Sequence, residues 1–354
     1  EAAVDESRLL YDALATALAA SRSLEELDAS SGALGVIGVL QLVVPLLESE
    51  ACVLRRLACS ALPRAAIPSL TASLSLNRTL RTLKLGMNCL DVGAARLLAR
   101  AIERHAALTC LTLEHNQTLD SGAAALGATL VTNQLRTLSV AFTGAADGAC
   151  EALALAIALR RPLADLCLCG NGVGPSGVGA LSTALEAAGC EGCLTALNLS
   201  ANQRLDVSSV RAIARALPCT RLVELQLAGV SAWDERPRVH GMSAHACGVL
   251  AAALPGCPTL ERLDLSMNPF GDMGAWGLAW ALPECSRLRE LDLSSCEVGD
   301  DGADELLEAL DANTTLATLD LRGNKIHPKH VLGRDVARVR LEFQRPVLSS
   351  VFAV

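Results

Sequence analysis

A repeated leucine pattern constrains this chain more than any other feature. The pattern L-x-x-L-x-L starts at Leu80 and recurs at spacings of 28, 27, 28, 31, 28, 38, 28 and 28 residues. Weaker copies start at Leu24 and Leu54, so about 11 repeats are visible in all. A period of roughly 20–50 residues indicates a stack of similar units rather than several separate globular domains.

Each repeat predicts one strand followed by one helix. The last two leucines of L-x-x-L-x-L alternate as the buried face of a strand does. A glycine then precedes leucines four and eight residues later, as in Gly274, Leu278 and Leu282, and this spacing marks one face of a helix. Asparagines close most of the strands, where their amides can bond open backbone groups: Asn88, Asn116, Asn171, Asn202, Asn268 and Asn324. Cys296 takes the same position in another repeat.

These repeats resemble the leucine-rich repeat family, in its ribonuclease-inhibitor-like subclass with 28-residue units. The resemblance covers residues 24 to about 330. It implies an α/β solenoid, a horseshoe with a parallel β-sheet on the concave face and α-helices on the convex face. Members of the family are mostly binding proteins, among them inhibitors, Ran GTPase activators, sensor regions of NOD-like receptors and scaffold subunits. The motif therefore specifies the fold and says little about the partner.

The repeats also suggest how the chain is divided. We expect an N-terminal capping helix in residues 1–23 and two degenerate repeats in residues 24–79. Nine regular repeats should fill residues 80–330, with an insertion at one rim, residues 231–241. Residues 331–354 should form a C-terminal cap with a closing strand.

Composition disfavours nucleic-acid and membrane partners. The net charge is −8 and aromatic residues make up 2% of the chain, whereas nucleic-acid binding needs a basic face and stacking rings. The longest apolar stretch, Leu34–Leu47, is shorter than the ~20 residues of a membrane span. Fourteen scattered cysteines are best interpreted as small, reduced core residues of an intracellular protein.

Residues 172–177 contain the glycine pattern G-x-G-x-x-G, which is typical of a dinucleotide-binding turn. However, Gly174 and Gly177 align with glycine pairs of later repeats: Gly271 and Gly274, and Gly299 and Gly302. An acidic residue at the end of the next strand is missing, because Asn198 stands there. We interpret the pattern as the ordinary turn from strand to helix, and we predict no nucleotide and no other cofactor.

Two clusters suggest chemistry, and each has a structural alternative. Asp264, Asp292 and Asp320 should form an acidic ladder on the concave sheet, where carboxylates can shift one another's pKa or bind a cation. The alternative is that Leu-Asp-Leu is a common filling of this repeat, and we favour it. Cys190 and Cys193 form a C-x-x-C pair, and Cys219, Cys257 and Cys285 form a column three residues before successive strands. Four such thiolates could hold zinc, but a column of small buried residues at the helix-to-strand turn fits this spacing better. With no nucleophile, histidine and acid grouped together, we predict no enzyme activity.

Tryptophans give the best candidates for partner binding. The insertion at 231–241 carries Trp233, Asp234, Glu235, Arg236 and Arg238. Trp276 and Trp280 lie two and six residues after Gly274, whereas the core leucines lie four and eight after it, so the indoles should face solvent. Exposed tryptophans are enriched at binding hot spots. The alternative is that they lie along neighbouring helices or under the inserted loop.

Charge is also segregated along the chain, since residues 261–320 hold 3 basic and 14 acidic groups, a net charge of −11.

We therefore expect a non-catalytic protein–protein interaction scaffold, or a structural subunit of a larger eukaryotic assembly. Its partners would be other proteins within a multi-subunit complex. We expect an intracellular, cytoplasmic location, with a cilium or the cytoskeleton as one suitable setting. The alternative is a regulatory protein of the same family, such as a Ran-type GTPase activator or an immune-type sensor region.

Overall fold

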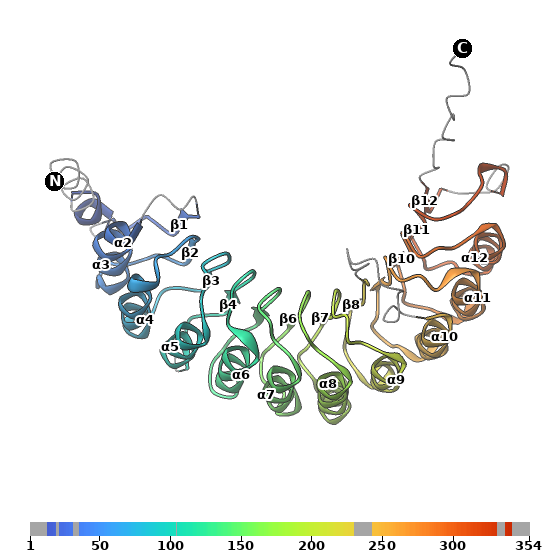
Figure 1. The fold of residues 1–354 in the computed structure, drawn as a ribbon, viewed down its shortest axis with the longest axis horizontal. Coiled ribbons are helices and arrows are strands. Elements are labelled where there is room, and N and C mark those ends of the chain that lie inside the picture. Colours follow the sequence, from blue (N-terminus) through green and yellow to red (C-terminus); the bar gives the residue numbers. More distant parts are fainter. Residues whose placement is uncertain are drawn as a thin grey trace, which may run out of the picture. The chain divides into compact units, whose positions relative to one another are not determined.

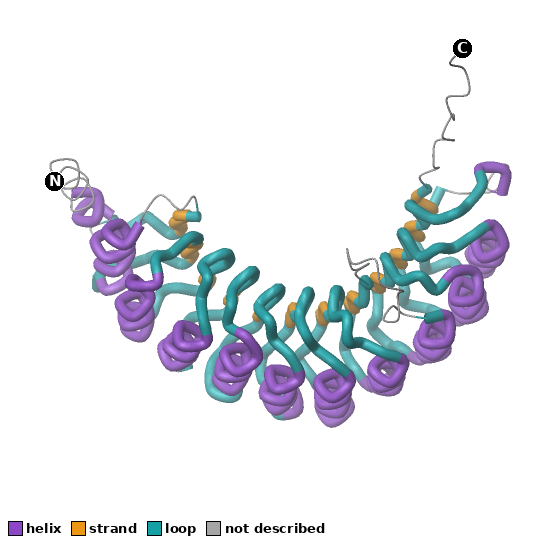
Figure 2. Tube along the Cα trace, viewed as in Figure 1, coloured by secondary structure: helices purple, strands orange, loops and turns teal. Residues whose placement is uncertain are grey.

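The computed structural model describes residues 13–18, 21–30, 35–103, 105–229, 243–330 and 337–341. The chain forms two compact units. The first comprises residues 1–205 and 219–222, and the second comprises residues 206–218 and 223–354. In each unit, short parallel strands lie on one side and helices on the other (Figures 1 and 2). This arrangement confirms the predicted α/β fold of stacked strand–helix repeats.

The first unit has seven described strands, which pair in sequence order and in parallel: β1 (Glu26–Ala29), β2 (Arg56–Cys59), β3 (Thr82–Lys84), β4 (Cys110–Thr112), β5 (Thr137–Ser139), β6 (Asp165–Cys167) and β7 (Ala196–Asn198). Its helices are α2 (Gly35–Gly38), α3 (Val44–Glu48), α4 (Ile67–Leu76), α5 (Val92–Ile102), α6 (Leu119–Thr129), α7 (Asp147–Ala158) and α8 (Pro175–Ala188). The π-helical turn η1 (Val39–Val43) and the 3₁₀ turns η2 (Arg64–Ala66) and η3 (Gly189–Glu191) complete it. Residues 13–18 are also helical.

The second unit continues the same order with five described strands: β8 (Glu224–Gln226), β9 (Arg262–Asp264), β10 (Glu290–Asp292), β11 (Thr318–Asp320) and β12 (Val339–Arg340). Its helices are α9 (Val207–Ala216), α10 (Ala244–Ala253), α11 (Gly271–Ala281) and α12 (Asp300–Ala312). Short 3₁₀ turns follow several helices: η4 (Leu217–Cys219), η5 (Leu254–Gly256), η6 (Leu282–Glu284) and η7 (Pro328–His330). The predicted rim insertion and most of the predicted C-terminal cap lie outside the described residues.

Leucines of the strands and helices form the core between the two layers. The register pairs equivalent positions, so that Leu83 pairs with Leu111 and Leu111 with Leu138. Each of these leucines is buried, as are the helix leucines Leu98 and Leu126. None of these repeats can bury its own apolar face, and each therefore depends on its neighbours. In the part of the chain that the structure describes, no helix combines the length and apolarity needed to cross a membrane.

The asparagine column links each repeat to the one before it. The Asn116 side chain donates to the carbonyl of Leu85 at 2.8 Å, and its Oδ1 accepts from the backbone N–H of Leu90 at 2.9 Å. These bonds satisfy backbone groups that the short strands leave open inside the protein. In the second unit, the Cys296 thiol lies 3.2 Å from the carbonyl of Leu265 and takes the donor role of the asparagine amide.

Candidate interaction surfaces

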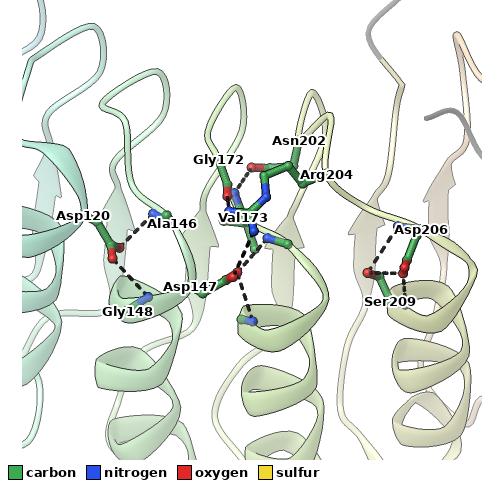
Figure 3. Close-up of polar contacts among 12 residues, drawn as sticks. Asp120, Ala146, Asp147, Gly148, Gly172, Val173, Asn202, Arg204, Asp206 and Ser209 are labelled. Atoms are coloured by element: carbon green, nitrogen blue, oxygen red, sulfur yellow. Dashed lines mark hydrogen bonds and ion pairs between the residues drawn. The ribbon is translucent and has the colours of Figure 1, made fainter. Parts of the chain in front are cut away.

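The N-termini of α7 and α8 in the first unit are occupied by carboxylates from the preceding repeat (Figure 3). Asp147 Oδ1 accepts from the backbone N–H groups of Gly174 at 2.7 Å and Gly177 at 3.1 Å. Asp120 does the same for α7, accepting from Ala146 and Ala149 at 2.8 Å each. The bonds satisfy amides that the first turn of a helix leaves free, and the carboxylate is favoured by the helix dipole.

The glycine fingerprint at 172–177 therefore has its own anion. The N–H groups that would meet a phosphate in a nucleotide site already donate to Asp147. Arg204 reinforces this arrangement, since it lies 3.6 Å from the Asp147 carboxylate and donates to the carbonyl of Gly172 at 3.1 Å. A Cβ atom on Gly177 would lie only 2.7 Å from Asp147 Oδ1, so glycine permits the close approach of the two repeats.

The same device recurs in the second unit. Asp272 Oδ1 accepts from the N–H groups of Gly299 at 2.6 Å and Gly302 at 3.1 Å, at the start of α12. At α9 the cap comes from the helix's own N-cap residue: Asp206 Oδ1 accepts from the N–H of Ser209 at 2.9 Å (Figure 3). Capping between repeats thus has a structural role, and no ligand chemistry follows from it.

The predicted acidic ladder is present on the sheet of the second unit. The register places Asp264 beside Asp292 and Asp292 beside Asp320. Each carboxylate accepts from the backbone N–H two residues later, at 2.9, 2.8 and 3.1 Å respectively. Such bonds end the strand by turning the backbone. Asn198 makes the same bond to Ser200 at 2.9 Å, so the position needs an oxygen acceptor rather than a charge.

The carboxylates at the two ends of the ladder differ in their electrostatics. Burial raises the pKa of Asp264, and the charges of Asp292 and Glu224 act in the same direction. Burial also acts to raise the pKa of Asp320, but hydrogen bonds and the charge of Arg322, with the charge of Arg340, outweigh it and lower that pKa. Arg322 binds Asp320 through two nitrogens, at 2.9 and 2.6 Å.

The ladder lines an open depression on the strand side of the second unit. Its volume is about 160 Å³, and Arg262 lies at its edge, donating to Glu224 at 2.8 Å. Among the described residues, no three His, Cys, Asp or Glu side chains come together as a metal site. The ladder's carboxylates therefore serve the strand ends, and a role in binding stays a prediction.

The cysteines divide into buried and exposed sets. All fourteen are free thiols, and burial raises the pKa of Cys59, Cys150, Cys247 and Cys296 to about 12. In the column before the strands, Cys257 and Cys285 are buried and donate to helix carbonyls, as expected of small core residues. The remaining members are exposed instead: Cys190, Cys193 and Cys219.

Helix α11 presents tryptophans to solvent, away from the core. Trp276 is 43% exposed and Trp280 is 81% exposed, whereas Leu278 on the opposite face is fully buried, as is Leu282 directly after the helix. Met273, one turn earlier, is 64% exposed. The inserted-loop candidates predicted from the sequence lie outside the described residues: Trp233, Asp234, Glu235, Arg236 and Arg238.

A second apolar surface, in the first unit, is not apparent from the repeat pattern. In three successive repeats, the residue just before the turn that follows the strand has a positive φ, between 53° and 58°: Met87, His115 and Phe142. Phe142 is 46% exposed, stacks on His115 with ring centroids 4.7 Å apart, and covers Gly170. We call these three residues the rim column. One sign of this backbone in the sequence is the glycine that the next repeat has at the same position, Gly170. Its φ of 67° shows that the position requires a left-handed backbone.

Comparison with known proteins yields the same repeat family. A family model described as a leucine-rich repeat matches residues 256–279, 284–307 and 312–329. A Tonsoku-like protein of Bos taurus is 32% identical over 241 residues, which are 60% of this chain and 17% of the relative. Ribonuclease inhibitor of Sus scrofa is 29% identical over 296 residues, 74% of this chain and 56% of the relative. The chain thus spans only part of each relative.

A solved structure shows the same fold at low sequence identity. An internalin from Listeria monocytogenes is similar with a TM-score of 0.50 and 16% identity, over 95% of each chain. At that identity the likeness describes the arrangement of strands and helices, and it does not extend to a ligand or a partner.

Proposed function

Because the chain is a leucine-rich repeat protein of the ribonuclease-inhibitor-like type, we propose that it is a non-catalytic protein–protein interaction scaffold. It would serve as a structural subunit of a larger eukaryotic assembly and bind other proteins of that complex. The setting that we propose is the cytoplasm, with a cilium or the cytoskeleton as candidates.

One observation carries this proposal: the exposure of Trp276 and Trp280 on a single face of α11. A large aromatic ring left in water forgoes the ~25 cal/mol per Å² that its burial would contribute. Tryptophan is one of the residue types that dominate the free energy of binding at protein interfaces, and here two tryptophans lie one helical turn apart. The tryptophans therefore favour a surface that is covered when a partner binds.

The acidic ladder and two buried cysteines also support a non-catalytic role. Asp264, Asp292 and Asp320 are engaged by backbone N–H groups, and Asp320 also by Arg322. Burial raises the pKa of Cys247 and Cys296, which opposes formation of a nucleophilic thiolate. These groups are held for the fold, whereas an active site needs a general base poised beside a substrate.

The test is affinity purification of the chain from its source, followed by identification of the proteins bound to it. We expect the variant W276A/W280A to lose partners that the wild-type chain retains. The matched control is L155A, because Leu155 is 55% exposed on α7 of the other unit. An identical set of partners for W276A/W280A and wild type would contradict docking through α11.

The regulatory alternative makes a different prediction. A Ran-type activator would stimulate GTP hydrolysis by a Ran-like GTPase, and an assay of phosphate release measures this directly. Stimulation by the purified chain would replace the scaffold proposal with the regulatory one.

A further inference from the structure

The exposed residues of α11 form one apolar stripe. Met273, Trp276 and Trp280 are spaced at i, i+3 and i+7, so they lie on one face of the helix. Their exposed fractions are 64%, 43% and 81%. The stripe covers about 10 Å along the axis, at ~1.5 Å per residue. This is the spacing at which an amphipathic helix presents its own anchoring residues to a groove or face.

The two helices beside α11 flank this stripe differently. Helices α10 and α12 both pack against α11. Aligned through Leu250, Leu278 and Leu306, α10 places Gly248 and Ala252 beside the tryptophans, and α12 places Asp304 and Glu308 there. A Cβ atom on Gly248 would meet nothing within 4 Å, so the α10 side is open. The stripe is thus bordered by small residues on one side and by carboxylates on the other.

Helix α12 carries acidic residues that its own stability does not explain. It holds six acidic residues and no basic ones: Asp300, Asp301, Asp304, Glu305, Glu308 and Asp311. Acids four residues apart repel one another, and those in the last turn oppose the helix dipole. His330 contacts Asp300 and Asp304, at 3.2 and 2.8 Å. No described residue forms an ion pair with Asp301, Glu305, Glu308 or Asp311.

We propose that α11 and α12 bind a basic amphipathic helix of a partner protein. The partner's apolar residues would cover Met273, Trp276 and Trp280, and its lysines and arginines would lie against Glu308 and the neighbouring acids of α12. The ammonium and guanidinium groups would relieve the repulsion within α12, and some would stack on the indole rings. The same acids disfavour an anionic membrane or a nucleic acid as the occupant. This inference rests on the proposed function, and it adds the chemistry of the partner.

The test uses two synthetic 18-residue helical peptides with identical leucine faces, one with lysines and one with glutamates on the polar face. Fluorescence of the full chain reports binding, and W233F removes the one tryptophan outside α11. We expect the lysine peptide to shift the tryptophan emission to the blue and to bind at least ~10-fold more tightly than the glutamate peptide. Added salt should weaken this binding, since it screens exposed charges.

Variants separate this site from general attraction to an acidic protein. E308K should weaken the lysine peptide and strengthen the glutamate peptide, whereas E151K, which changes the net charge equally on α7, should alter neither. In the W233F background, W280A should weaken both peptides while Trp276 still reports. Equal affinity for the two peptides, binding of neither, or equal effects of E308K and E151K would overturn the inference.

The outcomes also distinguish the inference from the proposed function. If native partners are lost from W276A/W280A but retained by E308K, the scaffold stands and the basic partner is overturned. If native partners survive W276A/W280A, docking through α11 fails, whatever the peptides do.

Discussion

Asp147 Oδ1 lies 2.7 Å from the backbone nitrogen of Gly174, which belongs to the next repeat. This bond joins two repeats at a helix N-terminus and fills the position where a phosphate would bind in a nucleotide site. Asp120 and Asp272 form the equivalent bonds elsewhere. Stability of these repeats therefore depends on polar caps between neighbours as well as on stacked leucines.

The first prediction concerns this cap. D147A should lower the free energy of unfolding by roughly 1–2 kcal/mol, since it leaves two helix amides without a partner. The control is E151A, because Glu151 is exposed one turn later on the same helix. Urea unfolding followed by circular dichroism gives both values. A loss from D147A no larger than that from E151A would show that the cap contributes nothing.

The second prediction compares two glycines of α8. G177A should be destabilising, because its Cβ would lie 2.7 Å from Asp147 Oδ1 and 3.0 Å from Asp147 Cα. G179A should be neutral or stabilising by up to ~1 kcal/mol, since nothing lies within 4 Å and alanine favours a helix. Thermal melts should place the melting temperature of G177A below that of the wild type and the melting temperature of G179A at or above it. Equal melting temperatures would rule out the close approach of α7 and α8 at Gly177.

The repeat pattern predicts the strand–helix order and the asparagine column, because both recur with the period of the sequence. It does not reveal what Asp147 does, because its partner amides belong to the next repeat and depend on how the two stack. The rim column is missed for another reason. Met87 and Phe142 occupy a left-handed position that other repeats fill with Gly170 or Gly323, and side-chain type alone does not report φ.

Exposure of Trp276 and Trp280 is predictable, because their offset from the core leucines specifies the side of the helix. The unequal pKa directions within the acidic ladder are not predictable from the repeat pattern. Asp264 and Asp320 occupy the same position of the repeat, and they differ because Arg322 binds the Asp320 carboxylate, whereas the charges acting on Asp264 are those of Asp292 and Glu224. Such differences arise from neighbours that do not follow the period.

The third prediction gives opposite signs to two equivalent substitutions. D264N should raise stability at neutral pH by roughly 0.2–1 kcal/mol, since it removes repulsion from Asp292 and keeps the oxygen acceptor, as Asn198 does. D320N should lower stability by roughly 1.5–3 kcal/mol, because it breaks a charged pair with Arg322. Urea denaturation of both variants at neutral pH measures the difference. A loss from D264N, or a gain from D320N, would contradict this description of the ladder.

The pH dependence follows from the same pKa directions. Because folding raises the pKa of Asp264, this residue's contribution to the free energy of unfolding is present below the pKa of the unfolded state. It is lost as pH rises through the pKa of the folded state. The lowered pKa of Asp320 means that its contribution is present above the unfolded pKa and is lost as pH falls through the folded pKa. Stability of D264N should thus decline less than that of wild type as pH rises above 4, and stability of D320N should decline less under acid.

The fourth prediction concerns thiol reactivity. In the native protein a thiol reagent should modify Cys89, Cys190, Cys193 and Cys219 rapidly, because all four are exposed. Cys59, Cys150, Cys247 and Cys296 should react only after unfolding, because burial raises their pKa to about 12 and restricts access. Mass spectrometry of alkylated peptides identifies each site. Rapid native modification of Cys247 or Cys296 would show that the packing around α10 and α11 is looser than described.

The most direct test of docking through α11 is hydroxyl-radical footprinting of the chain with and without its native partner. Tryptophan and methionine side chains oxidise readily, so exposed residues in both units report within one experiment. Docking through α11 predicts that Met273, Trp276 and Trp280 become protected in the complex, while Met87 and Phe142 of the rim column stay as reactive as in the free chain. Unchanged oxidation of Trp276 and Trp280, with protection at the rim column instead, would contradict it.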